Sequence, residues 1–356
     1  MRFNRRLAVV LLALLDASLS GIVSAQAFKE FSIPTASSSP FGIASGPDGR
    51  LWFTEESANS IGRVTTAGAF ASFLVPSPSA FNFPRGIAAG PDGNIWFAEQ
   101  ATNKIARITP AGVITEFSVP TSGSFPDDIV AGPDGNLWFT ELDGNMIGRI
   151  TPAGVVTEFL ISSGGGPLAI AAGPDGNLWF TEINIDKIGR ITPAGAIMEF
   201  PIPTPNSFPL GIAAGPDGNL WFTEGSGPAN QIGRITPAGV VTEFPVPTAS
   251  SFPSDIAGGP DGSLWFTEFG ANQIGRITTA GAITEFPLPN PNSGLGGITA
   301  GPDGAMWFTE QFGNRIGRIT TGVVQTPAAV PTLSFPMLML LGLALAGSAV
   351  FLMRRS

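Results

Sequence analysis

The side chains best suited to chemistry in this sequence are seven glutamates, each at the end of a repeated block. The block is clearest at 215–224, where it reads Gly-Pro-Asp-Gly-Asn-Leu-Trp-Phe-Thr-Glu. The glutamates are Glu55, Glu99, Glu141, Glu182, Glu224, Glu268 and Glu310. A ring of carboxylates could bind a cation or supply general bases. The whole sequence lacks histidine, cysteine and tyrosine, so the commonest general base and the commonest ligand of transition metals are both missing.

Each glutamate is followed by an arginine, which favours a structural role over a catalytic one. The arginines are Arg63, Arg107, Arg149, Arg190, Arg234, Arg276 and Arg318. Eight positions separate glutamate from arginine in six repeats and ten in the remaining one. An even separation can place both side chains on one face of a hairpin, so we expect a cross-strand Glu–Arg ion pair in every repeat. Repeated ion pairs are commoner than seven equivalent catalytic acids.

A second set of positions varies among the repeats and gives the best candidates for ligand contacts. It lies two residues before an isoleucine that precedes each block, and it comprises Phe41, Arg85, Asp127, Leu168, Leu210, Ser254 and Gly296. Asp128 and Asp255 add acidic side chains beside it. Variable residues on a rigid scaffold are typical of binding sites. The alternative explanation is that these loop residues vary among the repeats without any selection for binding.

The elements that must position these residues follow from the repeat itself. All seven tryptophans lie in copies of the block, about 42 residues apart. A period of this length with strand-like content and no helical pattern predicts the blades of a propeller. The third copy reads as four strands at 128–131, 137–141, 146–151 and 155–160. Pro-Asp-Gly and Thr-Pro-Ala-Gly turns connect the first to the second and the third to the fourth.

The ends of the repeat array predict how the ring closes. A copy of the fourth strand, 28–35, precedes the first block, whereas only a degraded copy, 322–325, follows the last one. We therefore expect an all-β, seven-bladed β-propeller of four-stranded blades over 28–326, with the N-terminal strand completing the last blade. The loops between second and third strands differ among blades, so the ligand site is expected on the face that carries them.

Both termini resemble targeting segments. Residues 1–27 combine an arginine-rich start, an apolar run and a small-residue cleavage site, which predicts a signal peptide. Residues 327–336 read as a linker with a sorting motif, and 337–356 as one C-terminal transmembrane helix with a basic tail. The protein should therefore be exported through the inner membrane. It would stay anchored in the cell envelope or be released to the surface after processing.

The charge of the exported part excludes one class of partner. Without the terminal segments, its net charge is about −13, so nucleic acid is not expected as a partner. We expect a monomeric propeller that binds a small molecule, a glycan or a protein. No metal, cofactor or disulfide is expected in this interpretation.

The repeated blocks, with outer strands such as Thr-Glu-Phe-Pro-Val-Pro-Thr at 242–248, resemble the virginiamycin B lyase family. The resemblance implies a seven-bladed propeller that opens a cyclic antibiotic by elimination, using two histidines and a magnesium ion held by glutamates. By repeat position, Ser254 and Gly296 stand where the family has histidines, and Gly294 stands in place of a metal-binding glutamate. Glu310 alone has a counterpart. A lyase-like enzyme using Glu310 and magnesium is therefore the alternative function.

A second resemblance concerns the C-terminus. Val-Pro-Thr-Leu-Ser at 330–334, followed by an apolar stretch and two arginines, is similar to the IPTL-type sorting signals of Gram-negative bacteria. These belong with signals that exosortase-like enzymes process, so the resemblance implies a sorting protease as a partner. Phe335 and Pro336 depart from the residues that commonly follow the motif. The favoured function is a non-enzymatic propeller that binds its ligand on the variable face. A purely structural role at the cell surface is a third possibility.

Overall fold

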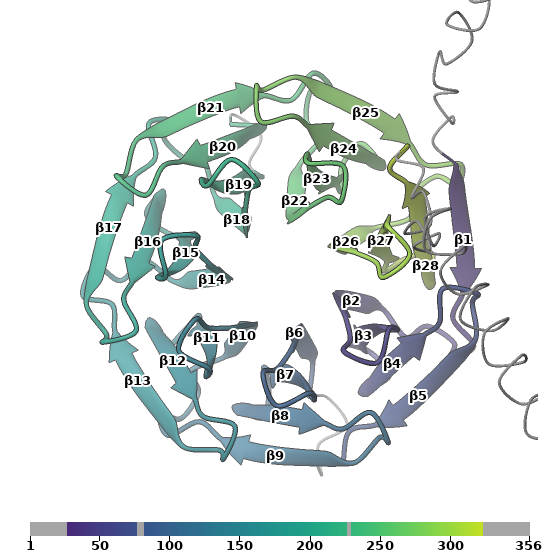
Figure 1. The fold of residues 1–356 in the computed structure, drawn as a ribbon, viewed down its shortest axis with the longest axis horizontal. Helices are drawn as coiled ribbons and strands as arrows, with labels where there is room; N and C mark the ends of the chain where they lie inside the picture. Colours follow the sequence, from purple (N-terminus) through teal and green to yellow (C-terminus); the bar gives the residue numbers. More distant parts are fainter. Residues whose placement is uncertain (1–26, 77–81, 226–228, 323–356) are drawn as a thin grey trace, which may run out of the picture. The chain divides into compact units, whose positions relative to one another are not determined.

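The computed structural model describes residues 27–76, 82–225 and 229–322. Within them, the strands form seven four-stranded antiparallel sheets around a common centre (Figure 1). The predicted all-β, seven-bladed propeller is therefore confirmed. The predicted linker and transmembrane helix lie outside the described residues, as does the signal peptide apart from Ala27. In the described part of the chain, no helix is long and apolar enough to cross a membrane.

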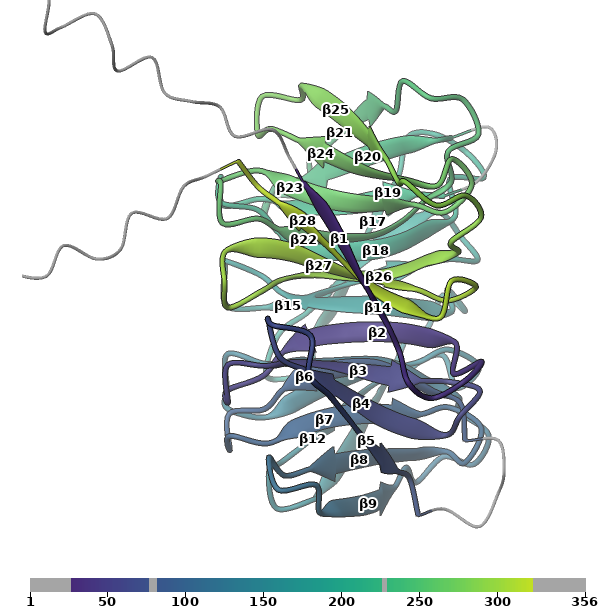
Figure 2. The ribbon, with the colours of Figure 1, turned by 90° about the vertical axis from the view of Figure 1, so that its right-hand side faces the viewer.

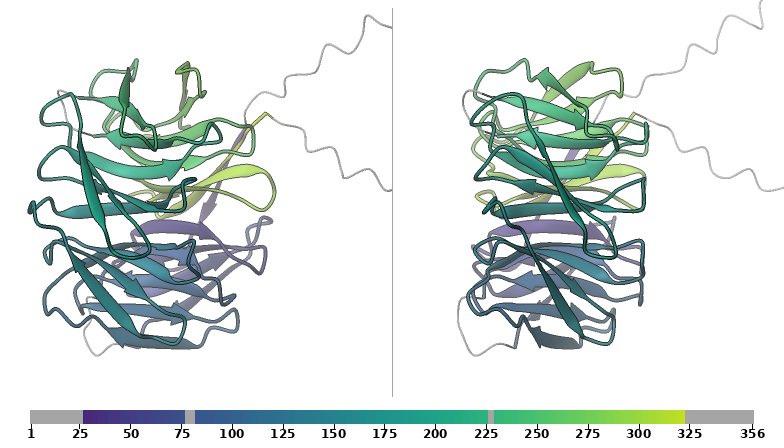
Figure 3. Two further views of the ribbon diagram at one scale, coloured as in Figure 1. Left: turned by 60° about the vertical axis from the view of Figure 1, so that its left-hand side comes forward. Right: turned by 90° about the vertical axis from the view of Figure 1, so that its left-hand side faces the viewer.

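Each blade places its strands in order from the centre to the rim, and the side views in Figure 3 show the sheets stacked beside one another. The innermost strands are β2 (Pro40–Ser45), β6 (Pro84–Ala89), β10 (Pro126–Ala131), β14 (Pro167–Ala172), β18 (Pro209–Ala214), β22 (Pro253–Gly258) and β26 (Leu295–Ala300). The second strands are β3 (Leu51–Glu55), β7 (Ile95–Glu99), β11 (Leu137–Glu141), β15 (Leu178–Glu182), β19 (Leu220–Glu224), β23 (Leu264–Glu268) and β27 (Ala305–Glu310).

The outer half of each blade consists of a third strand and a rim strand. The third strands are β4 (Ser60–Val64), β8 (Lys104–Ile108), β12 (Met146–Ile150), β16 (Lys187–Ile191), β20 (Gln231–Ile235), β24 (Gln273–Ile277) and β28 (Arg315–Thr320). The rim strands are β5 (Phe70–Leu74), β9 (Ile114–Ser118), β13 (Val156–Leu160), β17 (Ile197–Pro201), β21 (Val241–Pro245), β25 (Ile283–Pro287) and β1 (Phe28–Ser32).

The second strand is the most buried element of each blade. In β11, all five residues are buried, because neighbouring blades cover both faces of the sheet. The rim strand β13 instead contains exposed residues and faces solvent on its outer side. The core of the protein therefore lies between blades, and a single blade could not bury its own apolar faces.

One tryptophan per blade builds this core, as the third blade illustrates. The indole N–H of Trp138 donates a hydrogen bond to Asp134 Oδ1 at 3.0 Å. Its ring stacks on Phe159 of the rim strand with centroids 5.4 Å apart. The same tryptophan packs against Ile170 and Phe180 of the fourth blade. Tryptophan is therefore the residue that joins one blade to the next, and aspartate fixes its orientation.

The predicted Glu–Arg pairs are wrong. Arg149 lies opposite Trp138 in the β11–β12 hairpin, whereas Glu141 lies opposite Met146. The loop between these strands has four residues, so directly opposed residues are separated by an odd number of positions. An even separation of eight places the two side chains on opposite faces of the sheet. No ion pair joins the glutamate ring to the arginine positions named above, within the residues that the structure describes.

The arginines instead connect neighbouring blades on the face opposite the variable loops. The guanidinium of Arg149 lies 5.5 Å from the ring centroid of Trp138 and 4.0 Å from Asp134 Oδ2. Its Nη1 donates to the backbone carbonyl of Pro193, in the turn between the third and rim strands of the next blade. The same hydrogen bond recurs between other pairs of blades, as Arg63 to Pro110, Arg107 to Pro152 and Arg190 to Pro237.

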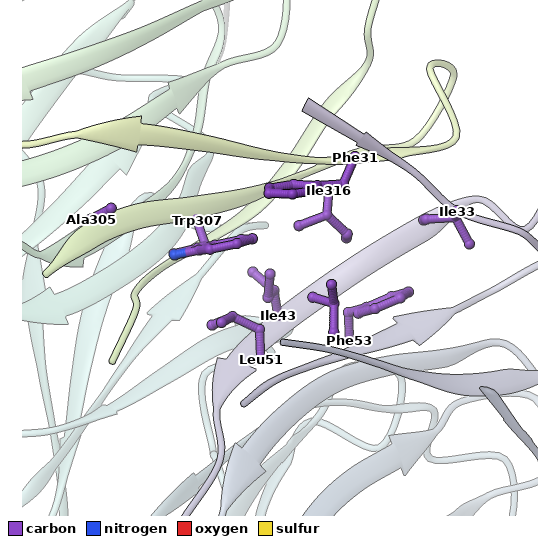
Figure 4. Close-up of a cluster of buried hydrophobic side chains, with 9 residues drawn as sticks. Phe31, Ile33, Ile43, Leu51, Phe53, Ala305, Trp307 and Ile316 are labelled. Carbon is purple, nitrogen blue, oxygen red and sulfur yellow. The ribbon is translucent and has the colours of Figure 1, made fainter. Parts of the chain in front are cut away.

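The two ends of the described chain meet in the seventh blade, as predicted. Strand β1 pairs with β28, and Figure 2 shows the two strands side by side. Phe31 stacks on Trp307 with centroids 5.4 Å apart, so β1 supplies the same aromatic contact as the other rim strands. Figure 4 shows that both residues belong to a buried cluster that also contains Ile43 and Phe53 of the first blade. The N-terminal strand therefore closes the ring.

Candidate functional site

A bulge in each innermost strand positions the variable residues. In the third blade, the register between β10 and β11 shifts between Pro126 and Ile129, so two intervening residues leave the regular ladder. Thr140 of the second strand stabilises this shape. Its hydroxyl accepts the backbone N–H of Asp128 at 3.0 Å and donates to the backbone carbonyl of Leu168 in the next blade at 2.7 Å. Equivalent threonine hydroxyls connect six of the blades to the bulge of the next blade, and Ala98 takes this position in the second blade.

These bulges line one cavity of about 340 Å³ near the centre of the ring. All nine ligand-binding candidates from the sequence contribute to it: Phe41, Arg85, Asp127, Asp128, Leu168, Leu210, Ser254, Asp255 and Gly296. Positions spread over the whole chain are therefore brought together on the variable face. That the cavity binds a ligand remains a prediction.

Polar side chains gather on one side of the cavity. The guanidinium of Arg85 lies 3.6 Å from both Asp127 and Glu56, and 4.3 Å from the ring centroid of Phe41. Gln100 donates to Asp127 at 2.7 Å. Burial is the main cause that raises the pKa of Asp127 to about 6, with Arg85 acting in the opposite direction. Arg85 is thus held in place between two acids and an aromatic ring.

Three residues at or near the cavity come from the variable loops, whose face the sequence interpretation expected to carry the ligand site without naming these residues as candidates. Glu56, Gln100 and Leu142 each follow the last residue of a second strand, and Leu142 lines the cavity. A signal is present in the sequence, because this position also varies among the blades: Glu56, Gln100, Leu142, Ile183, Gly225, Phe269 and Gln311. The repeat pattern does not show that the first loop residue reaches the next blade.

Apart from the carboxyl groups of Asp128 and Asp255, the rest of the cavity is apolar or small. Leu142, Leu168 and Leu210 form an apolar wall, and Ser254 and Gly296 leave the remaining wall almost without side chains. At Gly296, a Cβ atom would lie 2.6 Å from Thr309 Oγ1 and 3.0 Å from the backbone oxygen of Phe41. The present backbone therefore leaves no room for a side chain at this position.

Asp128 and Asp255 have a structural role that their sequence positions did not indicate. Asp128 accepts the backbone N–H of Ile129 at 2.8 Å and that of Ile170, in the next blade, at 2.9 Å. Asp255 accepts the corresponding groups in the sixth and seventh blades. Burial raises the pKa of Asp128 to about 7 and that of Asp255 to about 6. Both carboxyl groups are engaged in joining blades. Substitution of either residue would therefore alter the contact between blades as well as any contact with a ligand.

The glutamates at the ends of the second strands do not reach the cavity. All seven are fully buried, beneath the loops that follow the second strands. Neither carboxyl oxygen of Glu224 has a hydrogen-bond partner within the described residues. Burial, together with the negative charges of Glu243 and Asp186, raises the pKa of Glu224 to about 8. Glu310 is also buried and lies 3.1 Å from Arg315.

The residues present do not fit the magnesium ion that the family resemblance implies. Gly294 offers no side-chain ligand, and the carboxyl group of Glu310 is engaged with Arg315. Among residues 27–76, 82–225 and 229–322, no three histidine, cysteine or acidic side chains are placed to hold a metal ion together. We therefore derive no step through magnesium.

The raised pKa of Glu224 predicts that Glu224→Gln stabilises the protein at alkaline pH. A raised pKa means that the stabilising contribution of the neutral form is present below the ordinary value of 4.5 and is lost as pH rises through about 8. The neutral amide avoids that loss. Urea denaturation should show a gain of about 1–3 kcal/mol at pH 9 and little change at pH 5. Asp143→Asn, an exposed control, should show neither effect. Equal gains at both pH values would contradict this account.

This chain is similar to a known protein family and to solved structures of its members. The model of the virginiamycin B lyase family matches residues 13–207 and 163–333. Virginiamycin B lyase from Staphylococcus aureus is 40% identical, and the match covers 83% of this chain and 99% of that one, with a TM-score of 0.79. A catalytically inactive histidine-to-alanine variant of that enzyme, with quinupristin, matches at 40% identity over 83% and 99% of the two chains, with a TM-score of 0.78.

More distant structures share the fold alone. Hydrazine synthase from Kuenenia stuttgartiensis is 17% identical, with 82% of this chain and 98% of that chain covered and a TM-score of 0.68. The repeated blocks, the ring closure and the extent of the family match lead to one conclusion. This chain belongs to the virginiamycin B lyase family.

Proposed function

We propose that this protein is a non-catalytic member of its family and binds its ligand in the central cavity of the variable face. The observation that carries the proposal is the cavity itself, which is lined by the residues that vary among otherwise uniform blades. A rigid ring with variable residues at its mouth is suited to binding. A shared fold does not carry its chemistry with it.

The side chains support binding over elimination. An elimination needs a base that removes a proton. The inactive Staphylococcus aureus variant lacks one histidine, whereas this sequence contains none. Ser254 and Gly296 stand where the family resemblance places the two histidines, and neither replaces an imidazole. Glu310, the base in the lyase alternative, is fully buried and engaged with Arg315.

The cavity indicates the chemistry of its ligand. Leu142, Leu168 and Leu210 offer an apolar surface, and Arg85 and Asp127 offer charged groups on the other side. A ligand should therefore combine an apolar part with a polar group that faces Arg85. A small molecule, a glycan end or a protruding protein segment could satisfy this pattern. The 40% identity to virginiamycin B lyase keeps the lyase as the second candidate, and the same experiment decides between them.

A two-readout experiment tests this proposal. The full chain is incubated with quinupristin, maltotriose or short apolar peptides in the presence of magnesium. Ligand-observed NMR measures binding, and mass spectrometry measures chemical change. We expect saturable binding of at least one probe and no linearised quinupristin. Arg85→Ala should weaken binding by about tenfold or more, because a charged hydrogen bond is lost. Leu168→Trp should abolish it by filling the cavity.

Matched controls separate the site from general damage. Val155→Ala changes an exposed residue near the opposite face and should leave binding unchanged. Binding that survives both cavity variants would place the ligand elsewhere and contradict the proposed site. Linearised quinupristin that appears with the native chain would instead establish the lyase candidate.

We also propose that the propeller is exported and held in the cell envelope. The support is the signal-like sequence 1–27 and the apolar stretch within 337–356. When a Gram-negative host that expresses the full chain is fractionated, the protein should be found with the membranes. A truncated variant that ends at Gln325 should be found in the periplasm. Mass analysis of the C-terminus reports whether a sorting protease removes the anchor. Recovery of the full chain from the soluble cytoplasm would contradict this location.

A further inference from the structure

A second cavity, separate from the central one, lies in the first blade near the closure of the ring. Its volume is about 150 Å³. It is lined by Ile33, Pro34 and Thr35 after β1, by Phe53 and Glu55 of β3, and by Phe70, Ala71 and Ser72 of β5. Ile33 and Phe53 belong to the buried cluster drawn in Figure 4. The cavity therefore has apolar walls and a carboxyl group in its lining.

The other blades carry longer side chains than the first blade at two equivalent positions, and in two of them one of these side chains is a lysine. Their rim strands carry a glutamate where the first blade has Ser72: Glu116, Glu158, Glu199, Glu243, Glu285 and Glu30. Opposite the buried glutamate, the second blade has Lys104, whereas the first has Ser60. Lys104 Nζ lies 2.7 Å from Glu116. Burial raises the pKa of the neighbouring Glu99 to about 7, and the charge of Lys104 acts in the opposite direction. The fourth blade repeats this arrangement with Lys187 and Glu199 at 2.9 Å.

The first blade thus keeps the buried acid but lacks the lysine. Glu55 is fully buried, and one of its oxygens accepts the hydroxyl of Ser72 at 2.7 Å. Its other oxygen, Oε1, is buried without a hydrogen-bond partner within the described residues. A buried carboxyl oxygen without a partner is costly, and a cation within reach would offset that cost. Two serines leave space where other blades use longer side chains.

We propose that this first-blade cavity binds a primary ammonium group carried on a short aliphatic stem. In their blades, Lys104 and Lys187 pair with the rim-strand glutamates Glu116 and Glu199. The first blade has Ser72 at that rim position, so the bound ammonium donates instead to the buried Glu55. Thr35 and Ser72 provide further hydroxyl oxygens at the cavity lining. The stem lies against Ile33, Phe53 and Phe70. An ammonium has three donors and needs acceptors around it, which this lining offers.

NMR titration of the full chain with n-butylammonium tests the proposal. Saturable shifts are expected for the amide groups of Thr35 and Ser72. The same titration with 1-butanol, which has the stem without the charge, should give no saturable shift. Glu55→Gln should weaken binding by about tenfold or more, because the charged partner is lost. Glu99→Gln, which alters the equivalent buried acid of the second blade, should leave binding unchanged.

A second variant tests occupancy while preserving the acid. Ser60→Lys combined with Ser72→Glu rebuilds the arrangement of the second blade, so the chain supplies its own ammonium and n-butylammonium binding should disappear. This variant is expected to fold, because six other blades carry the glutamate and two carry the lysine. Circular dichroism and thermal unfolding confirm its fold before the titration.

The outcomes are distinct. Loss of binding in both variants, with binding retained in Glu99→Gln, supports the proposal. Equal binding to 1-butanol, equal binding to the rebuilt first blade, or no saturable binding overturns it. Nα-acetyl-lysine N-methylamide is the second probe. If both this probe and n-butylammonium bind, the site extends to lysine side chains of peptides. If n-butylammonium alone binds, the site is restricted to free amines.

Discussion

The contact on which the whole ring depends is the buried tryptophan between neighbouring blades. Its N–H is fixed by aspartate, one face stacks on the phenylalanine of the rim strand, and an arginine lies within 6.0 Å of the ring centroid in every blade. Each tryptophan needs a phenylalanine from the rim strand of its own blade. In the last blade, Phe31 of the N-terminal strand supplies this ring and stacks on Trp307. The block that contains these residues has little freedom to change. Variation is left to the loops and bulges of one face.

That division is consistent with our proposal that this chain keeps the family fold without the family's chemistry. Thr140 and its equivalents hold the bulges through backbone atoms, whatever side chain the bulge presents. A bulge can therefore present Ser254 without disturbing the blades, whereas the bulge at Gly296 leaves no room for a side chain. Asp128 and Asp255 are exceptions, because their side chains join blades as well as line the cavity. Under our proposal, this scaffold of the lyase family, with other residues at its centre, serves to bind a ligand.

The sequence predicts the features that depend on repetition and misses those that depend on register. The strands of the third blade, the closure by 28–35 and the grouping of the variable ring all follow from period and turn residues. The Glu–Arg pairing failed because one hairpin loop length decides which residues are opposed. The roles of Glu56 and Gln100 were missed because they act on the next blade. The cavity at Glu55 becomes visible only when the filled blades are compared with the first one.

The central claim is that the variable face holds a binding cavity at the middle of the ring. Crystallographic soaking with a library of small fragments tests it most directly, because the natural ligand does not have to be identified first. Our account predicts that fragments collect in the cavity of about 340 Å³, in contact with Arg85 or Asp127. A cavity that stays empty while fragments bind at other surfaces of the propeller would contradict it.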